Sequence, residues 1–500
     1  MSKILTGGRI ASTRNDVVKF ISSIEYDKKI KDSVILINQA HVIMLDEEKI
    51  IEHEEALKII NALEKIKKEL KLEKPFIENV EDVHTLIEEE VIKKIGYEVA
   101  GNMHIAKSRN DQVSTAIRME LREKILELML SILKIQKSML ELAKKHLNTL
   151  IIGYTHLQPA QPTTFAHYMI SIIDSLTRDL ERLHQLYFRV NQCPMGACAL
   201  ATTSFKINRN RVAELLGFDK VLENSLDAIT SRDYILETLS NLAIMAINIC
   251  RLIEDLILWS SYEFRLIDIP EEFSSTSSIM PQKKNPDILE VARARMSSLI
   301  GKFVSAITIL KGLPSSYNLD FQEITPILWN SIETSLNCNN MLSLLLKNLN
   351  VNQENIIKKI NESFITATEL ANVLTRKYKI PFRKSHKIVG ALAKKLIEEK
   401  IEISRISPEL LDEILNKELK EPLKIDREDI KNALDPKNFI ALHDVLGGPS
   451  PSIVKEAIAN RNRKILEFEK IIENKKSRLE KALENLNKIV ASYSLSNQIK

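Results

Sequence analysis

The chain has 500 residues, of which 44% are hydrophobic and 28% charged, a composition that is typical of a globular protein and excludes a disordered one. The net charge is only +4, with 71 basic and 67 acidic residues, which argues against nucleic acid as a partner. We expect a cytoplasmic protein, since residues 1–13 lack the core of a secretory signal, no stretch approaches a membrane span, and the four cysteines form no disulfide or zinc pattern.

Glycine and proline are scarce, and three long intervals contain neither residue: 102–152, 218–269 and 327–380. Since both residues disfavour helix interiors, these intervals predict unusually long helices and an all-α fold. In the first interval apolar residues recur every three or four positions, which is the period of a helix and not of a strand. This apolar stripe consists of Ile117, Leu121, Ile125, Leu128, Ile132, Ile135, Met139 and Leu142.

The length of this helix bears on the organisation of the whole chain. At 1.5 Å per residue it would reach roughly 50 Å, which is longer than a compact domain needs for itself. Its stripe is therefore expected to pack into an extended bundle shared among subunits. We predict three mainly helical regions, 1–110, a central long-helix bundle over 111–360, and 361–500. The last contains a break at 447–451 and a closing amphipathic helix over 465–490.

Segment 107–113 opens the helix that carries the stripe. Ser108 or Asn110 suits the N-cap position, and a helix start with an arginine beside it attracts a carboxylate. Capping alone explains every residue of this segment except Arg109. Arg109 is therefore a candidate for anion binding.

Segment 153–162 reads as a compact polar turn before a helix. It contains Thr155 and His156, and a histidine can exchange a proton near neutral pH, which makes it a natural acid or base. A single histidine is, however, more often a structural group. The residues of this segment alone leave both interpretations open.

Segment 274–286 combines hydroxyls, ammonium groups and proline breaks before a new helix, and indicates a mobile, anion-binding loop. A serine hydroxyl can accept a proton only if nearby cations and amides stabilise its alkoxide. Lys283, Lys284 and the amides of the helix start are suited to this task. Composition alone leaves an exposed, serine-rich linker equally open.

These segments resemble motifs of the argininosuccinate lyase family, within the fumarase and aspartase superfamily. Run 277–285 is similar to the superfamily's signature loop of two serines, Met-Pro, lysines and asparagine. Run 153–158 is similar to the family motif Gly-Tyr-Thr-His-Leu-Gln. Run 108–112, Ser-Arg-Asn-Asp-Gln, is similar to the string that separates this family from fumarases and aspartases. A fourth stretch, 312–323, and weaker matches extend the resemblance over nearly the whole chain.

The resemblance implies cleavage of argininosuccinate into arginine and fumarate without metal or cofactor. The implied catalytic residues are Ser277 as the base, Lys283 and Asn285 as stabilisers of the developing negative charge, and His156, Thr155 and Glu290 as the acid group. The residues implied to orient the substrate are Ser23, Ser108, Arg109, Asn110, Tyr317 and Gln322. The resemblance also implies a homotetramer in which three subunits contribute to each active site.

Several positions depart from the family pattern. Thr276 stands where a glycine is usual, and 105–107 and the turn 196–199 also differ. Thr325 replaces a lysine that is expected to help hold a substrate carboxylate, which leaves the source of a compensating cation open. One alternative is adenylosuccinate lyase, which shares the serine loop and the product fumarate, although its phosphate-binding signatures are not evident here. The other is a non-catalytic, crystallin-like homologue, against which the retained acid and base residues argue.

Overall fold

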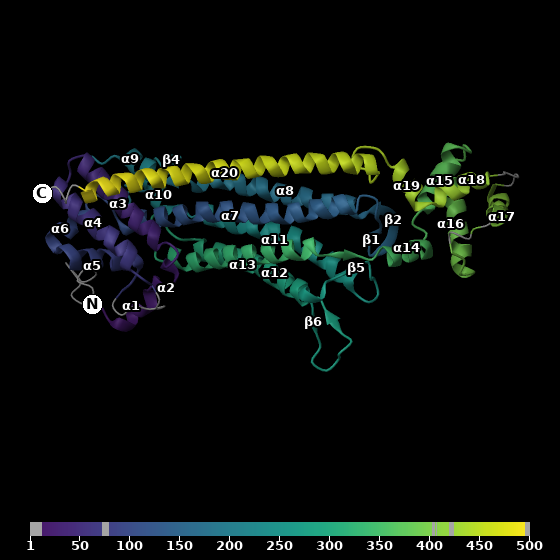
Figure 1. Cartoon of the computed structure of the whole chain (residues 1–500), viewed down its shortest axis with the longest axis horizontal. Helices are drawn as coiled ribbons and strands as arrows, with labels where there is room; N and C mark the ends of the chain where they lie inside the picture. Colours follow the sequence, from purple (N-terminus) through teal and green to yellow (C-terminus); the bar gives the residue numbers. More distant parts are fainter. Residues whose placement is uncertain (1–12, 73–79, 403–405, 407, 420–424, 496–500) are drawn as a thin grey trace.

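The computed structural model describes residues 13–72, 80–402, 406, 408–419 and 425–495. Helices account for 71% of the structure, which confirms the all-α prediction. The molecule is elongated, with long helices side by side along its length and shorter helices at both ends (Figure 1). Residues 1–12, which include most of the segment considered for a leader, lie outside the described residues. Within the described ranges, none of the helices combines the length and apolar character needed to cross a membrane.

The body of the molecule is a bundle of long helices. They are α7 (Arg109–Lys145), α8 (Phe165–Val190), α11 (Asp233–Ser260), α12 (Asp287–Leu310), α13 (Phe321–Lys347) and α20 (Pro451–Leu495). Helix α7 lies inside this bundle, where it packs against α8, α13 and α20. With 37 residues, it spans about 55 Å. The long helices predicted from the intervals without glycine and proline are therefore confirmed.

Helix α7 is buried on more than one face. All eight residues of the predicted stripe are buried, and so are Met119, Leu126 and Leu133, because neighbouring helices cover α7 from several sides. Of the two N-cap candidates, the structure selects Ser108, whose side chain accepts a hydrogen bond from the Asn110 amide at 3.4 Å. The Ser108 amide in turn donates to Asp111 Oδ1 at 2.9 Å, which completes a capping box.

Shorter helices cover the two ends of the bundle (Figure 1). At the end that holds the start of α7 lie α1 (Asn15–Ile21), α2 (Ile24–Asp27), α3 (Lys31–Glu47), α4 (His53–Glu69), α5 (Val83–Ile95), α6 (Tyr97–Gly101), η1 (Asn102–His104), α9 (Arg209–Leu215) and α10 (Ser225–Thr230). At the opposite end lie α14 (Gln353–Glu362), α15 (Ala367–Arg376), α16 (Phe382–Glu398), α17 (Pro408–Leu419), α18 (Arg427–Leu434) and α19 (Pro436–Leu442). One hydrophobic core joins the N-terminal helices to the bundle, and a smaller separate core lies within α15–α18.

The strands are short and occur in pairs at the ends of helices. The antiparallel pairs are β1 (Leu150–Thr155) with β2 (Gln158–Thr164), β5 (Ile267–Asp268) with β8 (Asn350–Val351), and β6 (Ser275–Thr276) with β7 (Lys284–Asn285). The parallel pair is β3 (Gln192–Cys193) with β4 (Lys220–Val221). A single-turn 3₁₀ helix, η2 (Glu271–Phe273), precedes β6. Two of these pairs carry the segments singled out as candidate catalytic loops.

Helix α20 begins at Pro451, the last residue of the predicted break, and returns along the bundle to the N-terminal helices (Figure 1). Arg461 pairs with Asp174 of α8 at 2.7 Å. Near the far end, the Tyr493 hydroxyl donates to Asp46 of α3 at 2.5 Å. The closing helix therefore connects both ends of the molecule. Its close contact with the turn after α9 depends on Gly217, which has a φ of +73° and leaves only 2.9 Å between an added Cβ and the Ala482 side chain.

We expect Gly217→Ala to lower the free energy of unfolding by about 1–3 kcal/mol, because a left-handed backbone is strained in alanine and the new methyl group would push α20 away. Gly101→Ala is the matched control, since Gly101 lies in a helix with open space around its Cβ position. Denaturant unfolding of the two variants measures the difference. If Gly217→Ala proves as stable as Gly101→Ala, the close contact does not hold α20 in place.

Candidate active site

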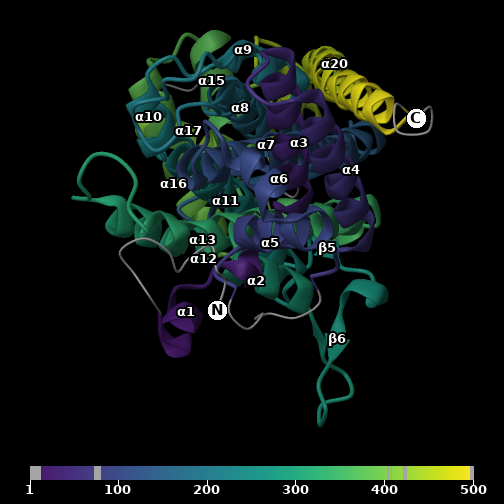
Figure 2. The ribbon, with the colours of Figure 1, turned by 90° about the vertical axis from the view of Figure 1, so that its left-hand side faces the viewer.

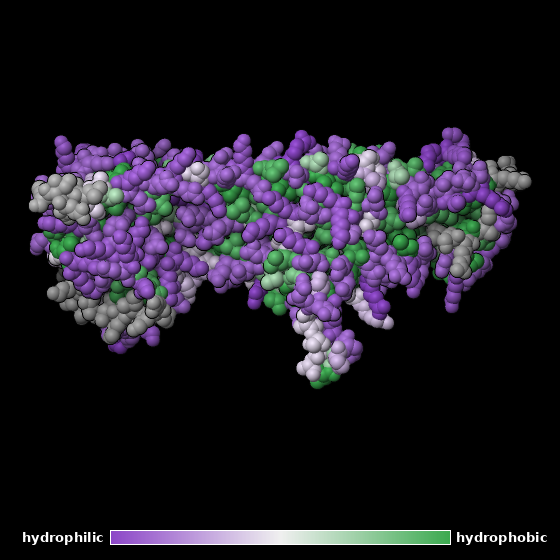
Figure 3. All heavy atoms as spheres, viewed as in Figure 1, coloured by the Kyte–Doolittle hydropathy of each residue, from purple (hydrophilic) through white to green (hydrophobic). Residues whose placement is uncertain are grey.

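The serine-rich segment forms a narrow hairpin that stands away from the helical body (Figures 1 and 2). Strands β6 and β7 pair Ser275 with Asn285 and Thr276 with Lys284. Ile279 at the tip is 83% exposed, and the projecting end shows apolar atoms at the surface (Figure 3). An exposed apolar tip is typical of a segment that packs against a partner.

The hydroxyl of Ser277 lies at the start of this tip and accepts hydrogen bonds from two backbone amides. The amide of Met280 donates to Ser277 Oγ at 3.2 Å and that of Ile279 at 3.4 Å. Amide dipoles aimed at an oxygen favour negative charge on it. The turn is thus suited to stabilising a Ser277 alkoxide, although these amides lie at the hairpin tip and not at the helix start, where the sequence led us to expect them. The Lys283 amide donates to the Met280 carbonyl at 3.1 Å and closes the turn.

The segment with Thr155 and His156 is a β-hairpin at the opposite end of α7 from Arg109 (Figure 1). His156 and Leu157 form its turn, with φ values of +56° and +57°. The turn exposes the side chains of Thr155 and His156 to solvent. Glu290, the predicted partner of His156, lies in the first turn of α12. Among the described residues of one chain, these two side chains form no hydrogen bond or ion pair with each other.

Four of the six predicted substrate-binding residues line one narrow cavity at the N-terminal end of the bundle. They are Ser23, Arg109, Tyr317 and Gln322. The cavity lies where α2, the starts of α5, α7 and α11, and the loop before α13 meet, so residues from widely separated parts of the chain come together. Gln322 Nε2 donates to the Ile21 carbonyl at 2.7 Å, and the Tyr317 ring lies edge-on to Phe321. These contacts hold both side chains at the cavity.

Arg109 is held at the cavity by two carboxylates and a hydroxyl. Its Nε lies 3.0 Å from Asp82 Oδ2 and its Nη1 lies 3.2 Å from Glu81 Oε2. Its Nη2 donates to Thr85 Oγ1 at 2.6 Å. A substrate carboxylate that binds Arg109 must therefore compete with groups of the same chain.

Asp27 is a second buried carboxyl group of the cavity. It accepts hydrogen bonds from the Ser23 hydroxyl at 2.8 Å and from the Val83 amide at 3.1 Å. Burial, and after it repulsion from Asp82, raises the pKa of Asp27 to about 7. Burial lowers the pKa of the neighbouring His84 to about 4, so this ring is neutral at physiological pH. The cavity thus offers carboxyl groups to a cationic ligand group.

The remaining two predicted binding residues, Ser108 and Asn110, flank this cavity and are not among its lining residues. Asn110 Nδ2 donates to the Ala199 carbonyl at 2.9 Å, in the turn that departs from the family pattern. Asp111 fixes the same turn, because its Oδ2 accepts hydrogen bonds from the amides of Gly196 and Cys198 at 3.0 and 2.8 Å. The start of α7 therefore positions a turn as well as Arg109.

The candidate residues thus occupy three separate regions of one chain: the cavity with the start of α7 beside it, the β1–β2 hairpin, and the β6–β7 hairpin with the first turn of α12 that follows it. The full length of α7 separates the cavity from the β1–β2 hairpin (Figure 1). Among the described residues, no group of three His, Cys, Asp or Glu side chains is arranged to hold a metal ion.

Comparison with known proteins identifies the family. Residues 9–301 match the family described as Lyase, and residues 364–441 match the one described as Argininosuccinate lyase C-terminal. The chain is 46% identical to the argininosuccinate lyase of Methanocaldococcus jannaschii over 98% of its own length and 100% of that protein. The chain belongs to the argininosuccinate lyase family. The argininosuccinate lyase of Methanococcus aeolicus is 44% identical to this lyase, over 97% of this chain and 98% of that protein.

Solved structures agree with this fold. A crystal structure of EDDS lyase in complex with formate superposes on this lyase with a TM-score of 0.86 and 28% identity, over 95% of this chain and 96% of that one. A class II fumarase from Schistosoma mansoni shares the fold with a TM-score of 0.71 at 16% identity, over 85% and 93% of the two chains. The long-helix bundle is therefore an architecture that this lyase shares with distant relatives.

Four charged groups of the cavity were not among the predicted site residues: Asp27, Glu81, Asp82 and Arg232. Asp27, Asp82 and Arg232 lie in weaker matches to the family pattern, for which no chemical role was predicted. Asp82 also caps the start of α5, which is a usual role for an acidic residue. No local pattern showed that these side chains converge.

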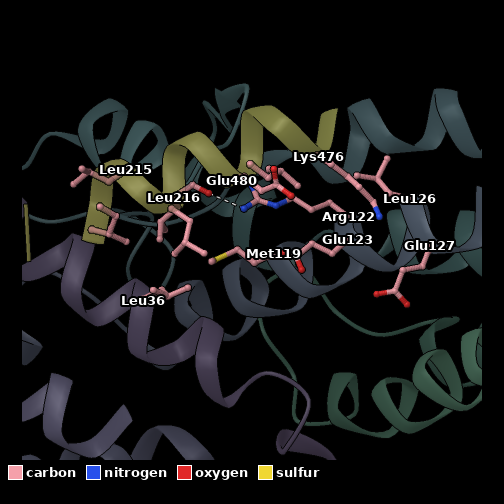
Figure 4. A pocket seen from close by; sticks show the side chains of 13 residues that line it. Leu36, Met119, Arg122, Glu123, Leu126, Glu127, Leu215, Leu216, Lys476 and Glu480 are labelled. Atoms are coloured by element: carbon pink, nitrogen blue, oxygen red, sulfur yellow. Dashed lines mark hydrogen bonds between the residues drawn. The ribbon is translucent and has the colours of Figure 1, made fainter. Parts of the chain in front are cut away.

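A second pocket of the lyase lies between α7 and α20 and contains none of the predicted residues (Figure 4). It has a volume of about 270 Å³ and is lined mostly by leucine side chains. Its buried cation, Arg122, donates to the Asn191 side chain at 2.9 Å and to the Leu216 carbonyl at 2.7 Å. Since these contacts and the ring of Phe218 below it fix Arg122 within the fold, we interpret this arginine as structural.

The raised pKa of Asp27 predicts that, in the ligand-free lyase, the difference in stability between Asp27→Asn and the wild type depends on pH. Because the folded chain keeps this proton to about pH 7, whereas an unfolded aspartate loses it near pH 4, wild-type stability falls as the pH rises through this window. The side chain of Asp27→Asn cannot ionise. The free energy of unfolding of this variant, relative to that of the wild type, should therefore rise from pH 4 to 7 and then stay constant, with a total rise of up to about 4 kcal/mol.

Thermal unfolding between pH 4 and 9 measures this difference. Asp32→Asn is the control, because the Asp32 side chain is 70% exposed and should show no such trend. A constant difference between Asp27→Asn and the wild type across the whole range would contradict the assigned protonation state.

Proposed function

We propose that this lyase splits argininosuccinate into arginine and fumarate in the cytoplasm, by β-elimination without metal or cofactor. The observation that carries the proposal is the 46% identity, over 98% of the chain, to a protein named argininosuccinate lyase. The cavity agrees with it, because carboxyl groups and guanidinium groups together suit the zwitterionic amino-acid end of such a substrate.

In this mechanism Ser277 removes the proton beside a carboxylate of the succinyl group. The two amides that donate to Ser277 Oγ favour its alkoxide, and the Lys283 ammonium adds positive charge at the same tip. Lys283 and Asn285 then stabilise the negative charge that develops on the substrate. The base is active only if its hairpin reaches a bound substrate.

The acid group is His156, with Thr155 beside it and Glu290 as the residue that orients the ring. It protonates the guanidino nitrogen as the bond from carbon to nitrogen breaks. The residues that orient the substrate are Ser23, Ser108, Arg109, Asn110, Tyr317 and Gln322. Closure of the β6–β7 hairpin over the substrate would exclude water.

Two features of the single chain support our proposal of a homotetramer with shared active sites. First, α7 keeps Arg109 and the β1–β2 hairpin about 55 Å apart, which no small substrate can span. Second, α11, α12 and α13 expose large apolar side chains, and apolar atoms are visible along the middle of the body (Figure 3). These side chains are Ile247, Val291, Ile300, Val304, Ile307, Met341 and Leu344.

Exposed apolar side chains on three neighbouring helices favour burial in a subunit interface. We assign these apolar side chains to the core of the tetramer. In the proposed division of the chain, this core belongs to region 111–360, and the helical regions 1–110 and 361–500 flank it. In that assembly, the cavity, the His156 hairpin and the Ser277 hairpin of one site come from three different subunits.

The purified chain should release fumarate from argininosuccinate, measured as ultraviolet absorbance, and a chelator should not change the rate. Adenylosuccinate should remain essentially unreacted under the same conditions. Comparable turnover of adenylosuccinate would favour that activity instead. Loss of activity on chelation that metal restores would refute the cofactor-free mechanism.

Shared sites predict complementation between inactive variants. Ser277→Ala and His156→Asn should each lower turnover by at least about 100-fold, as expected for groups that transfer protons. Co-refolded, the two variants should regain part of the wild-type activity, because some sites then combine an intact serine hairpin with an intact histidine from another subunit.

The matched control is a mixture of Ser277→Ala with Lys283→Met. Both substitutions lie in the β6–β7 hairpin, so no chain of this mixture supplies an intact β6–β7 hairpin. The mixture should therefore stay inactive. If verified mixed tetramers of the first pair are also inactive, the proposed sharing of sites is wrong.

A further inference from the structure

The pocket between α7 and α20 has a mostly apolar lining (Figure 4). Eight of its thirteen lining residues are leucine or methionine, and among them Leu126, Leu216 and Leu486 are almost completely buried. Its volume of about 270 Å³ is close to the lower end of the range for small-molecule sites. Since leucine side chains offer water no hydrogen bonds, a space of this kind favours an apolar group of a ligand.

The other lining residues of this pocket are charged, and three of them are unpaired. Glu123, Lys476 and Glu480 form no hydrogen bond or ion pair within the part of the chain that the structure describes. Lys476 and Glu480 are one helical turn apart on α20, a spacing at which opposite charges often pair. Glu127 differs, because it pairs with Lys124 at 2.9 Å. The pocket therefore presents one free ammonium group and two free carboxylates beside its apolar lining.

Arg122 adds a second positive charge to the wall of the pocket. Its Nη1 and Nη2 atoms are held within the fold by Asn191 and Leu216. Its Nε is buried and has no hydrogen-bond partner among the described residues, which is unfavourable for a charged donor. Two cations, Arg122 and Lys476, thus stand with two unpaired carboxylates, so the pocket suits a ligand that carries both a negative and a positive group.

The position of the pocket separates it from the substrate cavity and from the proposed subunit interface. Arg122 follows Arg109 by 13 residues in α7, a distance of about 20 Å along the helix. Helix α20 lies on the side of α7 away from α12 and α13 (Figures 1 and 2), which carry exposed apolar side chains of the proposed interface. A ligand can therefore reach this pocket in the assembled protein without entering the substrate cavity.

We propose that the pocket between α7 and α20 binds an apolar α-amino acid such as leucine. The ligand's carboxylate pairs with Lys476, and Arg122 adds positive charge behind it. The α-ammonium group binds Glu123 of α7 and Glu480 of α20, and the apolar side chain occupies the leucine-lined space. The bound amino acid links α20 to α7, so binding should also raise the melting temperature of the protein. The proposal does not depend on the function proposed for the active site.

Calorimetry on the assembled wild-type protein tests the chemistry of the ligand with leucine and three probes, each of which lacks one feature. The probe 4-methylpentanoate has no ammonium group, and 3-methylbutylamine has no carboxylate. Leucine should bind at least about 5-fold more tightly than either, because each probe leaves a charged partner unsatisfied. Serine has both charges but a small polar side chain, and should bind at least about 10-fold more weakly than leucine. Binding of serine as tight as that of leucine would contradict the apolar part of the site.

Two substitutions on α20 test the location of the site. Lys476→Met should weaken leucine binding about 5-fold and leave 3-methylbutylamine binding unchanged, because only the partner of the carboxylate is lost. Glu480→Gln should weaken leucine binding to a similar extent and leave 4-methylpentanoate binding unchanged. The matched controls are Lys481→Met and Glu484→Gln, since these side chains are exposed on the same helix and do not line the pocket. Both controls should bind leucine as the wild type does.

The side chains of Lys476 and Glu480 are not buried, so both variants should fold, and thermal unfolding in the absence of leucine checks this. If leucine does not bind the wild type, or if Lys476→Met and Glu480→Gln both keep the wild-type affinity, this pocket is not an amino-acid site. The fumarate assay is independent of this outcome, because the binding measurement needs no turnover.

Discussion

The rigid length of α7 is the constraint on which the rest of this lyase depends. A helix of 37 residues keeps its two ends about 55 Å apart, because each residue adds a fixed rise of 1.5 Å. One end positions Arg109 at the cavity, and the other leads into the hairpin with His156. A substrate of ordinary metabolite size cannot touch both ends, so the proposed chemistry requires more than one chain. Two features of the chain fit this requirement: the exposed apolar side chains of α11, α12 and α13, and the projecting β6–β7 hairpin. Both would be covered by the surface of another subunit.

The cavity at the start of α7 illustrates how a binding site is maintained at a cost to the stability of the free protein. Asp27 is buried deeply enough that its pKa rises to about 7, and Arg232 has two buried donors with no hydrogen-bond partner in the described part of the chain. Both arrangements are unfavourable in an empty cavity and would become favourable around a ligand that carries an ammonium and a carboxylate group. Arg109 differs, because its carboxylate partners are present in the free chain. The cavity therefore contains one cation that two carboxylates already hold, and two buried groups that a ligand with an ammonium and a carboxylate group would stabilise.

Much of the fold could be predicted because long helices leave a strong local signal. The stripe from Ile117 to Leu142, a cap at Ser108 or Asn110 and the break before α20 all follow from helical period and from residues that start or stop helices. The loops with Ser277 and His156 were found because they resemble known motifs, and their roles remain predictions. Asp27, Glu81, Asp82 and Arg232 were not assigned to the site, since acidic residues at a helix start and an arginine before a helix have ordinary explanations in capping.

The sequence by itself determined where the long helices lie, near which residues the first of them starts, and which polar segments are candidates for chemistry, because each of these depends on residues that are close in the chain. Only the tertiary structure decided that two candidate loops are hairpins, that α20 returns along the bundle to contact α3, and that Arg232 faces the same cavity as Arg109. Short strands form only where a partner strand lies, and the meeting of distant segments depends on how whole helices pack.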